Sequence, residues 1–138
     1  RLNYYVQSVA TTEKKHDSTF LTVTLGLIDQ DEVKEKFLVV CLNSSNQIIK
    51  FEVISIGNLN SSIVHPREVF KLAIDNNSAN IFLVHNHPSG ECIPSAEDIA
   101  FTKKIIEGCK LLQLRCLDHI IIGLDSYLSF FDDFCQLE

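Results

Sequence analysis

A continuous apolar run within KFLVVCL, residues 36–42, constrains the fold more than any other feature of the sequence. A strand with one face in water alternates apolar and polar residues, whereas an uninterrupted run is typical of a strand covered on both faces. NSSN at 43–46 is a turn signal, and the β-prone stretch QIIKFEVISI at 47–56 follows it. The sequence therefore predicts an antiparallel hairpin within a sheet against which helices pack.

The rest of the chain supplies the helices and further strands of an α+β domain. Pro66 is suited to the first position of a helix, and apolar residues continue at helical spacing to about Asn76. A second helix is predicted from Ser95 to about Leu111. Further strands are predicted at 4–9, 19–28, 80–85, 114–124 and 126–131.

Size and composition favour one globular domain outside membranes. The chain has 138 residues, and none of its apolar runs approaches the ~20 residues that a membrane helix needs. No signal-peptide pattern is visible at its start. The five cysteines are scattered without a Cys-x-x-Cys pair, which favours reduced thiols and a cytoplasmic protein.

The charge balance argues against direct nucleic-acid binding by this domain. Twelve Lys and Arg residues are outnumbered by eighteen Asp and Glu residues, which gives a net charge of −6. Nucleic-acid binding relies on basic side chains that neutralise phosphates, and the basic clusters here are short.

The densest group of metal-binding residue types lies in LVHNHPSGECIPSAEDIA, residues 83–100. Residues two apart in a strand point to the same side, so His85 and His87 at a strand end can aim at one point. Asp98 falls in the first turn of the following helix, which the intervening loop folds back over the strand end. Two imidazoles and one carboxylate suit Zn²⁺, with a fourth position left for water. Asn86, between the histidines, is expected on the opposite side as a loop-fixing residue.

Asp98 also has an ordinary structural explanation. Ser95 and Asp98 have the spacing of a capping box, and an acid at a helix start is favoured by the helix dipole without any metal. For Asp98 alone, the cap is the better interpretation. The combination of His-x-His, a Pro-Ser-Gly turn and Ser-x-x-Asp in one run favours the metal site. Cys92 in the same loop is a weaker candidate, a thiol that would replace the water.

One pattern in this stretch resembles the JAMM motif of JAB/MPN-domain metalloproteases. It consists of His85-x-His87-Pro88, a spacer and then Ser95-x-x-Asp98. Longer stretches resemble the bacterial RadC family, namely SIGNLNSSIVHPREVF (55–70), HNHPSG (85–90), PSAEDIAFTKK (94–104) and LDHIIIG (117–123).

This resemblance covers roughly residues 32–130. It implies a JAB/MPN-like fold, of the cytidine-deaminase-like type, with a mixed β-sheet and flanking helices in a single domain. Residues 1–30 do not contribute to the resemblance. We therefore expect an N-terminal extension at 1–30, packed on the core, and a RadC-type JAB/MPN domain at 31–135.

The JAMM pattern implies a glutamate upstream of the histidines as general base. Glu35 immediately precedes the apolar strand and is favoured, while Glu32 and Glu52 remain alternatives and a solvated surface acid remains the competing explanation for Glu35. The family pattern also implies that Ser95 donates to the oxyanion, provided that capping does not occupy its hydroxyl.

Ligating histidines usually donate their second N–H to another group. Asp118 and His119 in LDHIII are candidates for such partners, although a purely structural role explains them equally well.

The resemblance implies a Zn²⁺-dependent metallopeptidase that hydrolyses a peptide or isopeptide bond in a protein substrate. The alternative is a non-catalytic RadC module that docks onto DNA-repair or replication proteins. The position of the Glu35 carboxylate distinguishes the hydrolase from the non-catalytic module, because a hydrolase needs this glutamate beside the histidines. The sequence leaves both a monomer and a homo-oligomer open.

Overall fold

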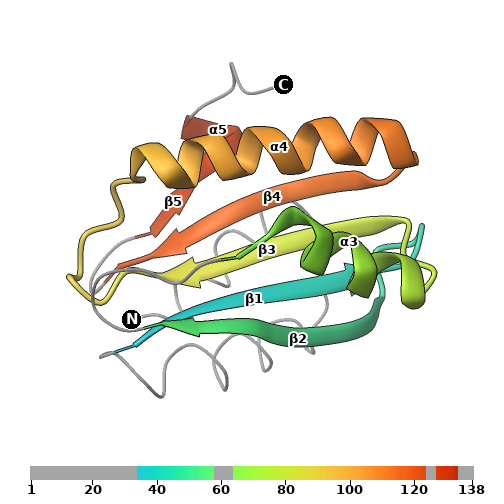
Figure 1. The fold of residues 1–138 in the computed structure, drawn as a ribbon, viewed down its shortest axis with the longest axis horizontal. Coiled ribbons are helices and arrows are strands. Elements are labelled where there is room, and N and C mark those ends of the chain that lie inside the picture. Colours follow the sequence, from blue (N-terminus) through green and yellow to red (C-terminus); the bar gives the residue numbers. More distant parts are fainter. Residues whose placement is uncertain (1–33, 58–63, 124–126, 134–138) are drawn as a thin grey trace.

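A computed structural model describes residues 34–57, 64–123 and 127–133. The strands predicted at 4–9 and 19–28, and the predicted extension at 1–30, lie outside these residues. Within the described residues, five strands form one mixed sheet in the order β2-β1-β3-β4-β5 (Figure 1). Their bounds are β1 Glu35–Leu42, β2 Ile48–Gly57, β3 Asn80–Asn86, β4 Arg115–Ile122 and β5 Tyr127–Ser129. The predicted α+β architecture, a single domain with a mixed sheet and flanking helices, is confirmed.

The predicted hairpin is confirmed as the antiparallel pair β1 and β2. On its other side β1 pairs antiparallel with β3, so the apolar run lies between two strands, and all of its apolar residues are buried. β3 pairs parallel with β4, which requires a crossover connection. Helix α4, Ala96–Leu112, makes this crossover (Figure 1).

Helices α3, Pro66–Asp75, and α4 pack on the same face of the sheet, called the helix face below. In Figure 1, α4 runs along β4 and α3 lies over β1 and β3. The core on this face combines strand residues with residues of both helices: Phe37, Val39, Cys41, Ile81, Leu83 and Cys116 from the strands, Val69 and Ala73 from α3, and Ile105 and Cys109 from α4. The predicted starts of both helices, at Pro66 and after Ser95, are confirmed.

The second core cluster lies on the opposite face of the sheet and consists of strand residues, namely Leu38, Val40, Leu42, Phe82, Val84, Leu117, Ile120 and Ile122. Strand alternation explains the division, because successive residues of β1 and β3 point to opposite faces. A residue of β1 or β3 can therefore be assigned to a face from its place in the alternation.

The prediction of one strand over 126–131 is wrong in its second half. Tyr127–Ser129 form β5, but Phe130–Asp133 turn into the short helix α5. The change coincides with side-chain acceptors that satisfy the backbone at the helix start: the Ser129 hydroxyl accepts from the Asp132 N–H and the Asp118 carboxylate from the Phe131 N–H. Such local acceptors favour a helix start over a continued strand.

Four cysteines lie within the described residues, and no disulfide joins any two of them. Cys41, Cys109 and Cys116 are buried in the core on the helix face, as expected of inert apolar side chains. None of the helices in the described part of the chain is long and apolar enough to cross a membrane.

Candidate metal centre

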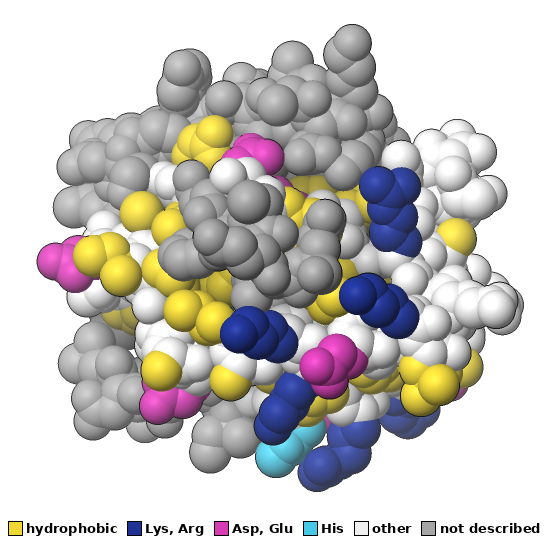
Figure 2. All heavy atoms as spheres, turned by 90° about the horizontal axis from the view of Figure 1, so that it is seen from above, with side chains coloured by type: hydrophobic (Ala, Val, Ile, Leu, Met, Phe, Trp, Pro, Cys, Tyr) yellow, Lys and Arg dark blue, Asp and Glu magenta, His cyan; other side chains and the backbone are white. Residues whose placement is uncertain are grey.

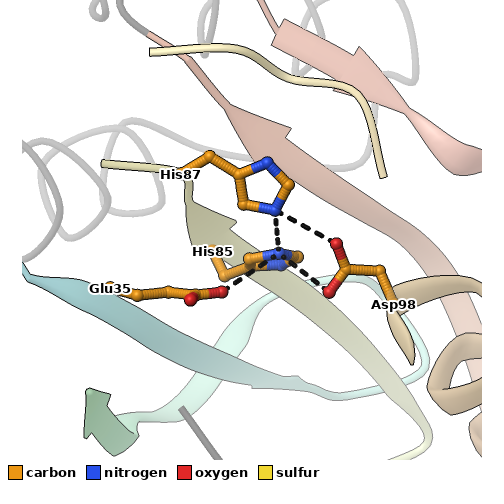
Figure 3. A group of neighbouring side chains, drawn as sticks. All are labelled: Glu35, His85, His87 and Asp98. Carbon is orange, nitrogen blue, oxygen red and sulfur yellow. Dashed lines mark hydrogen bonds and ion pairs between the residues drawn. The ribbon is translucent and has the colours of Figure 1, made fainter. Parts of the chain in front are cut away.

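The end of β3 brings the two histidines of the motif together. His85 follows Ile81 and Leu83 in the alternation and therefore points to the helix face, where it is 1% exposed. His87 lies just beyond the strand, but its N–H still donates to the Ile122 carbonyl of β4 at 3.0 Å, so the residue stays in line with the sheet. The two Nε2 atoms are 3.1 Å apart, as the two-residue spacing predicts (Figure 3).

The turn after His87 orients its ring. The Gly90 N–H donates to the His87 carbonyl at 2.9 Å, and Gly90 adopts a φ of 89°, a conformation that favours glycine. The chain then returns so that the Glu91 carbonyl lies 3.0 Å from His87 Nδ1. A carbonyl only accepts, so Nδ1 carries the hydrogen and Nε2 faces the site.

The start of α4 contributes Asp98. Ser95 is the N-cap, its Oγ accepts from the Asp98 N–H at 3.0 Å, and its own N–H donates to Asp98 Oδ2 at 2.9 Å. The same carboxylate lies 3.1 Å from His87 Nε2 through Oδ2 and 3.5 Å from His85 Nε2 through Oδ1. The capping box and the predicted grouping with the histidines are therefore both present, because one carboxylate serves both.

Glu35, the first residue of β1, completes the group. Phe37 pairs with His85 across the β1–β3 ladder, and Glu35 lies two residues before Phe37 on the same face. Its Oε1 is 3.6 Å from His85 Nε2, and its side chain is 17% exposed (Figure 3). Of the other two glutamates considered, Glu52 is exposed on β2 and outside the group, and Glu32 lies outside the described residues.

The four side chains form a cluster suited to a cation. One ligand atom from each of Glu35, His85, His87 and Asp98 lies within 4.8 Å of the others. Ionised carboxylates only accept hydrogen bonds, and a neutral imidazole whose Nδ1 carries the hydrogen presents a lone pair at Nε2. Acceptors that converge in this way need a positive centre between them, either a proton or a metal ion. The nitrogen and oxygen donor set fits a divalent metal.

The pKa values of the clustered side chains are shifted by burial and by one another. Burial raises the pKa of Glu35, and the nearby His85 and His87 only partly oppose this. Burial also acts to raise the pKa of Asp98, but hydrogen bonds with His85 and His87 outweigh it and hold that pKa well below its ordinary value. Burial alone would lower the pKa of His87, yet the hydrogen bond with Asp98 raises it overall.

Ser95 lies at the edge of the cluster on an exposed turn. Its hydroxyl oxygen accepts the cap hydrogen bond, but a hydroxyl can accept and donate at once. Capping therefore leaves the hydroxyl hydrogen available. Cys92 is not among the four residues whose ligand atoms converge.

The two residues named as candidate partners of the histidines occupy different places. His119 is fully buried on the helix face, and its Nε2 lies 2.8 Å from His85 Nδ1. Asp118 accepts from the Ser129 hydroxyl and from the N–H groups of His119 and Phe131, so it holds the backbone beside His119.

Two residues that hold neighbours of this group in place were not foreseen in these roles. Thr102 Oγ1, one helical turn after Asp98, lies 2.7 Å from His119 Nδ1. Asn86 is not a loop-fixing residue as expected: its amide donates to the Lys34 carbonyl and accepts from the Lys36 N–H, at the start of β1. The sequence signal for Thr102 is its spacing of four from Asp98, which places both on one side of α4.

The fold and this four-residue group define a JAB-type domain with a candidate metal site. The family model described as "RadC-like JAB domain" matches residues 14–135, and the chain belongs to this family. The match begins at residue 14, inside the segment 1–30 that showed no resemblance at the level of motifs.

Curated relatives agree with this assignment. A UPF0758 protein of Methanosarcina barkeri is 56% identical over 104 residues, which cover 75% of this chain and 45% of that protein. One from Caldanaerobacter subterraneus is 58% identical over 90 residues, covering 65% and 39%, and one from Latilactobacillus sakei is 51% identical over 98 residues, covering 71% and 44%. The chain spans less than half the length of these relatives, whose names state no activity.

Proposed function

We propose that the domain is a Zn²⁺-dependent hydrolase of the JAMM type, which cleaves a peptide or isopeptide bond in a protein substrate. The observation that carries the proposal is the position of Glu35, with its carboxylate 3.6 Å from His85 Nε2 in a group of two imidazoles and a second carboxylate. Three of these residues, His85, His87 and Asp98, are a ligand set used by catalytic zinc.

A bound zinc ion would supply Lewis acidity, lowering the pKa of water and polarising the scissile carbonyl. Glu35 acts as the general base, accepts the proton of the attacking water at its carboxylate and returns it to the departing amine. Burial raises the pKa of Glu35 in the metal-free protein, which is the direction expected of a base that must also act as an acid. Ser95 donates its free hydroxyl hydrogen to the oxyanion.

The alternative, a non-catalytic interaction module, predicts an occluded site or a Glu35 that points away from the histidines. Glu35, His87 and Asp98 each keep 16–17% of their side chain exposed, so the group is open to solvent on one side. The solvent exposure of the group and the position of Glu35 beside His85 both support the hydrolase. Figure 2 shows several Lys and Arg side chains gathered on the face seen from above, with an acidic side chain among them. Over the whole sequence the acidic residues outnumber the basic ones by eighteen to twelve, which supports a protein substrate over nucleic acid.

The first test is the zinc content of the purified domain. We expect about one zinc per chain in the parent and strong loss in His87→Ala and Asp98→Ala, since three protein ligands hold the ion. Glu52→Ala, on an exposed site of β2, serves as the control and should retain zinc. Equal metal content in all four proteins would overturn the metal site.

The second test separates hydrolysis from metal binding. Glu35→Gln keeps the shape of the side chain but cannot accept a proton, so it should retain zinc and lose about 100-fold or more in cleavage rate. The substrate is a pool of peptides and isopeptide-linked conjugates. Mass spectrometry counts the amines released, which are new amino termini from peptide bonds and free lysine side chains from isopeptide bonds. Glu52→Gln should cleave like the parent. Undiminished cleavage by Glu35→Gln would remove Glu35 from the mechanism.

A further inference from the structure

We propose that Thr102 and His119 form a hydrogen-bond relay that sets the tautomer of His85, so that this histidine presents a bare Nε2 to the metal. Both are positioning residues that act through His85. The relay rests on the proposed metal-binding role of His85 for its purpose, but the tautomer itself is a property of the metal-free protein.

The direction of the relay follows from its outer end. Thr102 Oγ1 is 2.8 Å from the Asp98 backbone carbonyl and 2.7 Å from His119 Nδ1. The carbonyl can only accept, so the single hydroxyl hydrogen of Thr102 is donated to it. The hydroxyl oxygen must then accept from His119, which requires that His119 Nδ1 carries a hydrogen.

His119 passes this constraint, a hydrogen on its own Nδ1, to His85 in the metal site. The His119 ring is fully buried between Phe130, stacked at 4.6 Å, and Phe37, edge-on at 5.5 Å, and neither of its nitrogens faces a carboxylate. A charged ring in such surroundings is costly, so His119 holds one hydrogen, on Nδ1. Its Nε2 must accept, and the donor 2.8 Å away is His85 Nδ1. His85 therefore carries its hydrogen on Nδ1, and its Nε2 keeps the lone pair.

The relay connects two of the proposed metal ligands, Asp98 and His85, through a continuous chain of hydrogen bonds. It starts at the Asp98 carbonyl on α4, passes through Thr102 and His119, and ends at His85 on β3. The tautomer of His87 does not depend on a relay, because the Glu91 carbonyl accepts directly from His87 Nδ1. The two histidines are thus prepared by independent means, one by a backbone carbonyl and one by buried side chains.

Loss of the Thr102 hydroxyl should release the relay. His119 would then be free to move its hydrogen to Nε2 and donate it to His85 Nδ1, which drives the His85 hydrogen onto Nε2. A histidine in that form must change tautomer before it binds a metal. Loss of such supporting partners typically lowers metal affinity by about 10–100-fold.

The relay is tested first on the parent chain without metal. Imidazole ¹⁵N shifts recorded at about pH 8, above the ordinary histidine pKa of ~6.5, distinguish protonated from bare ring nitrogens. We expect hydrogen on Nδ1 of His85, His87 and His119 alike. Hydrogen on Nε2 of His85 or His119 in the parent would overturn the relay.

Two matched variants then separate the relay from packing. Thr102→Val keeps the shape without the hydroxyl, and Thr102→Ser keeps the hydroxyl without the methyl group. We expect Thr102→Val to show Nε2 protonation of His85 and about 10–100-fold weaker zinc binding in a chelator competition, while Thr102→Ser retains the parent pattern. Equal losses in both variants, or none in Thr102→Val, would reject the relay. Absence of zinc binding by the parent would refute the proposed function, while the ¹⁵N pattern would still decide the relay.

Discussion

At the scale of single residues, the side-chain amide of Asn86 extends the pairing of two strands beyond their ladder. Its Nδ2 donates to the Lys34 carbonyl at 2.9 Å, and its Oδ1 accepts from the Lys36 N–H at 2.7 Å. These two peptide groups flank Glu35, so the amide holds the backbone of the proposed general base from both sides. A base held in this way needs less reorganisation to reach the reacting water.

We therefore predict that Asn86→Ala retains zinc but cleaves substrate roughly 10–100-fold more slowly, because small misplacements of a catalytic group are costly. Asn80→Ala is the matched control. Asn80 lies at the other end of β3, where its amide bonds the Asn43 carbonyl and the Asn46 side chain. Zinc content, cleavage rate and unfolding are measured for both variants. Similar cleavage rates in the two variants would contradict the role of Asn86.

At the scale of elements, the site depends on how the loop after β3 packs against the end of β4. A Cβ at Gly123 would lie 2.5 Å from the Gly90 carbonyl oxygen and 3.3 Å from the Cys92 nitrogen. Both are backbone atoms, which cannot move aside without moving the loop. The absence of a side chain at Gly123 thus allows the turn that returns to His87.

We predict that Gly123→Ala displaces this loop and weakens zinc binding by on the order of 10-fold or more, as expected when a ligand loses its supporting contacts. Gly108→Ala is the contrast, because its Cβ would lie 2.5 Å from the Phe70 ring, between α4 and α3. That variant should lower the unfolding temperature while zinc affinity per folded molecule stays near the parent value. The opposite pattern, weak binding in Gly108→Ala alone, would count against the packing argument. Calorimetry and chelator competition measure the two quantities.

At the scale of the whole molecule, the candidate metal joins parts of the chain that are far apart in sequence. Glu35 comes from the start of β1, His85 and His87 from the end of β3, and Asp98 from the start of α4. An ion bound only by the folded state stabilises it, by about 2.7 kcal/mol when free metal exceeds Kd by about 100-fold.

We predict that this stabilisation by zinc grows as the pH rises from about 6 to 8. The pKa of His87 is raised in the folded, metal-free protein, so its proton stabilises the fold fully below the ordinary value of ~6.5 and less as the pH rises through the folded pKa. Zinc must displace this proton, so it binds more tightly as the proton leaves. Unfolding temperatures with zinc or with chelator, measured across this range, give the difference. His87→Ala should show a small, pH-independent difference, and a parent curve that is flat or falling with pH would contradict the prediction.

Much of the local structure could be predicted from the sequence. The hairpin, both long helices and the grouping of His85 and His87 follow from periodicity, turn residues and the two-residue repeat of a strand, all of which act over a few neighbouring residues. The shared use of Asp98 as cap and site residue follows from its place in the first helical turn.

Only the tertiary structure decided which distant residues join that group. Glu35 lies beside His85 because of the β1–β3 register, whereas Glu52 lies in the exposed part of β2. A register shift between Ile81 and Phe82 in the β3–β4 pairing places His119, opposite Leu83, on the helix face. Without that shift, Asp118 would occupy the face toward His85. The physical reason is that a one-residue change in strand pairing exchanges the two faces, and pairing is set by contacts across the sheet that no local pattern records.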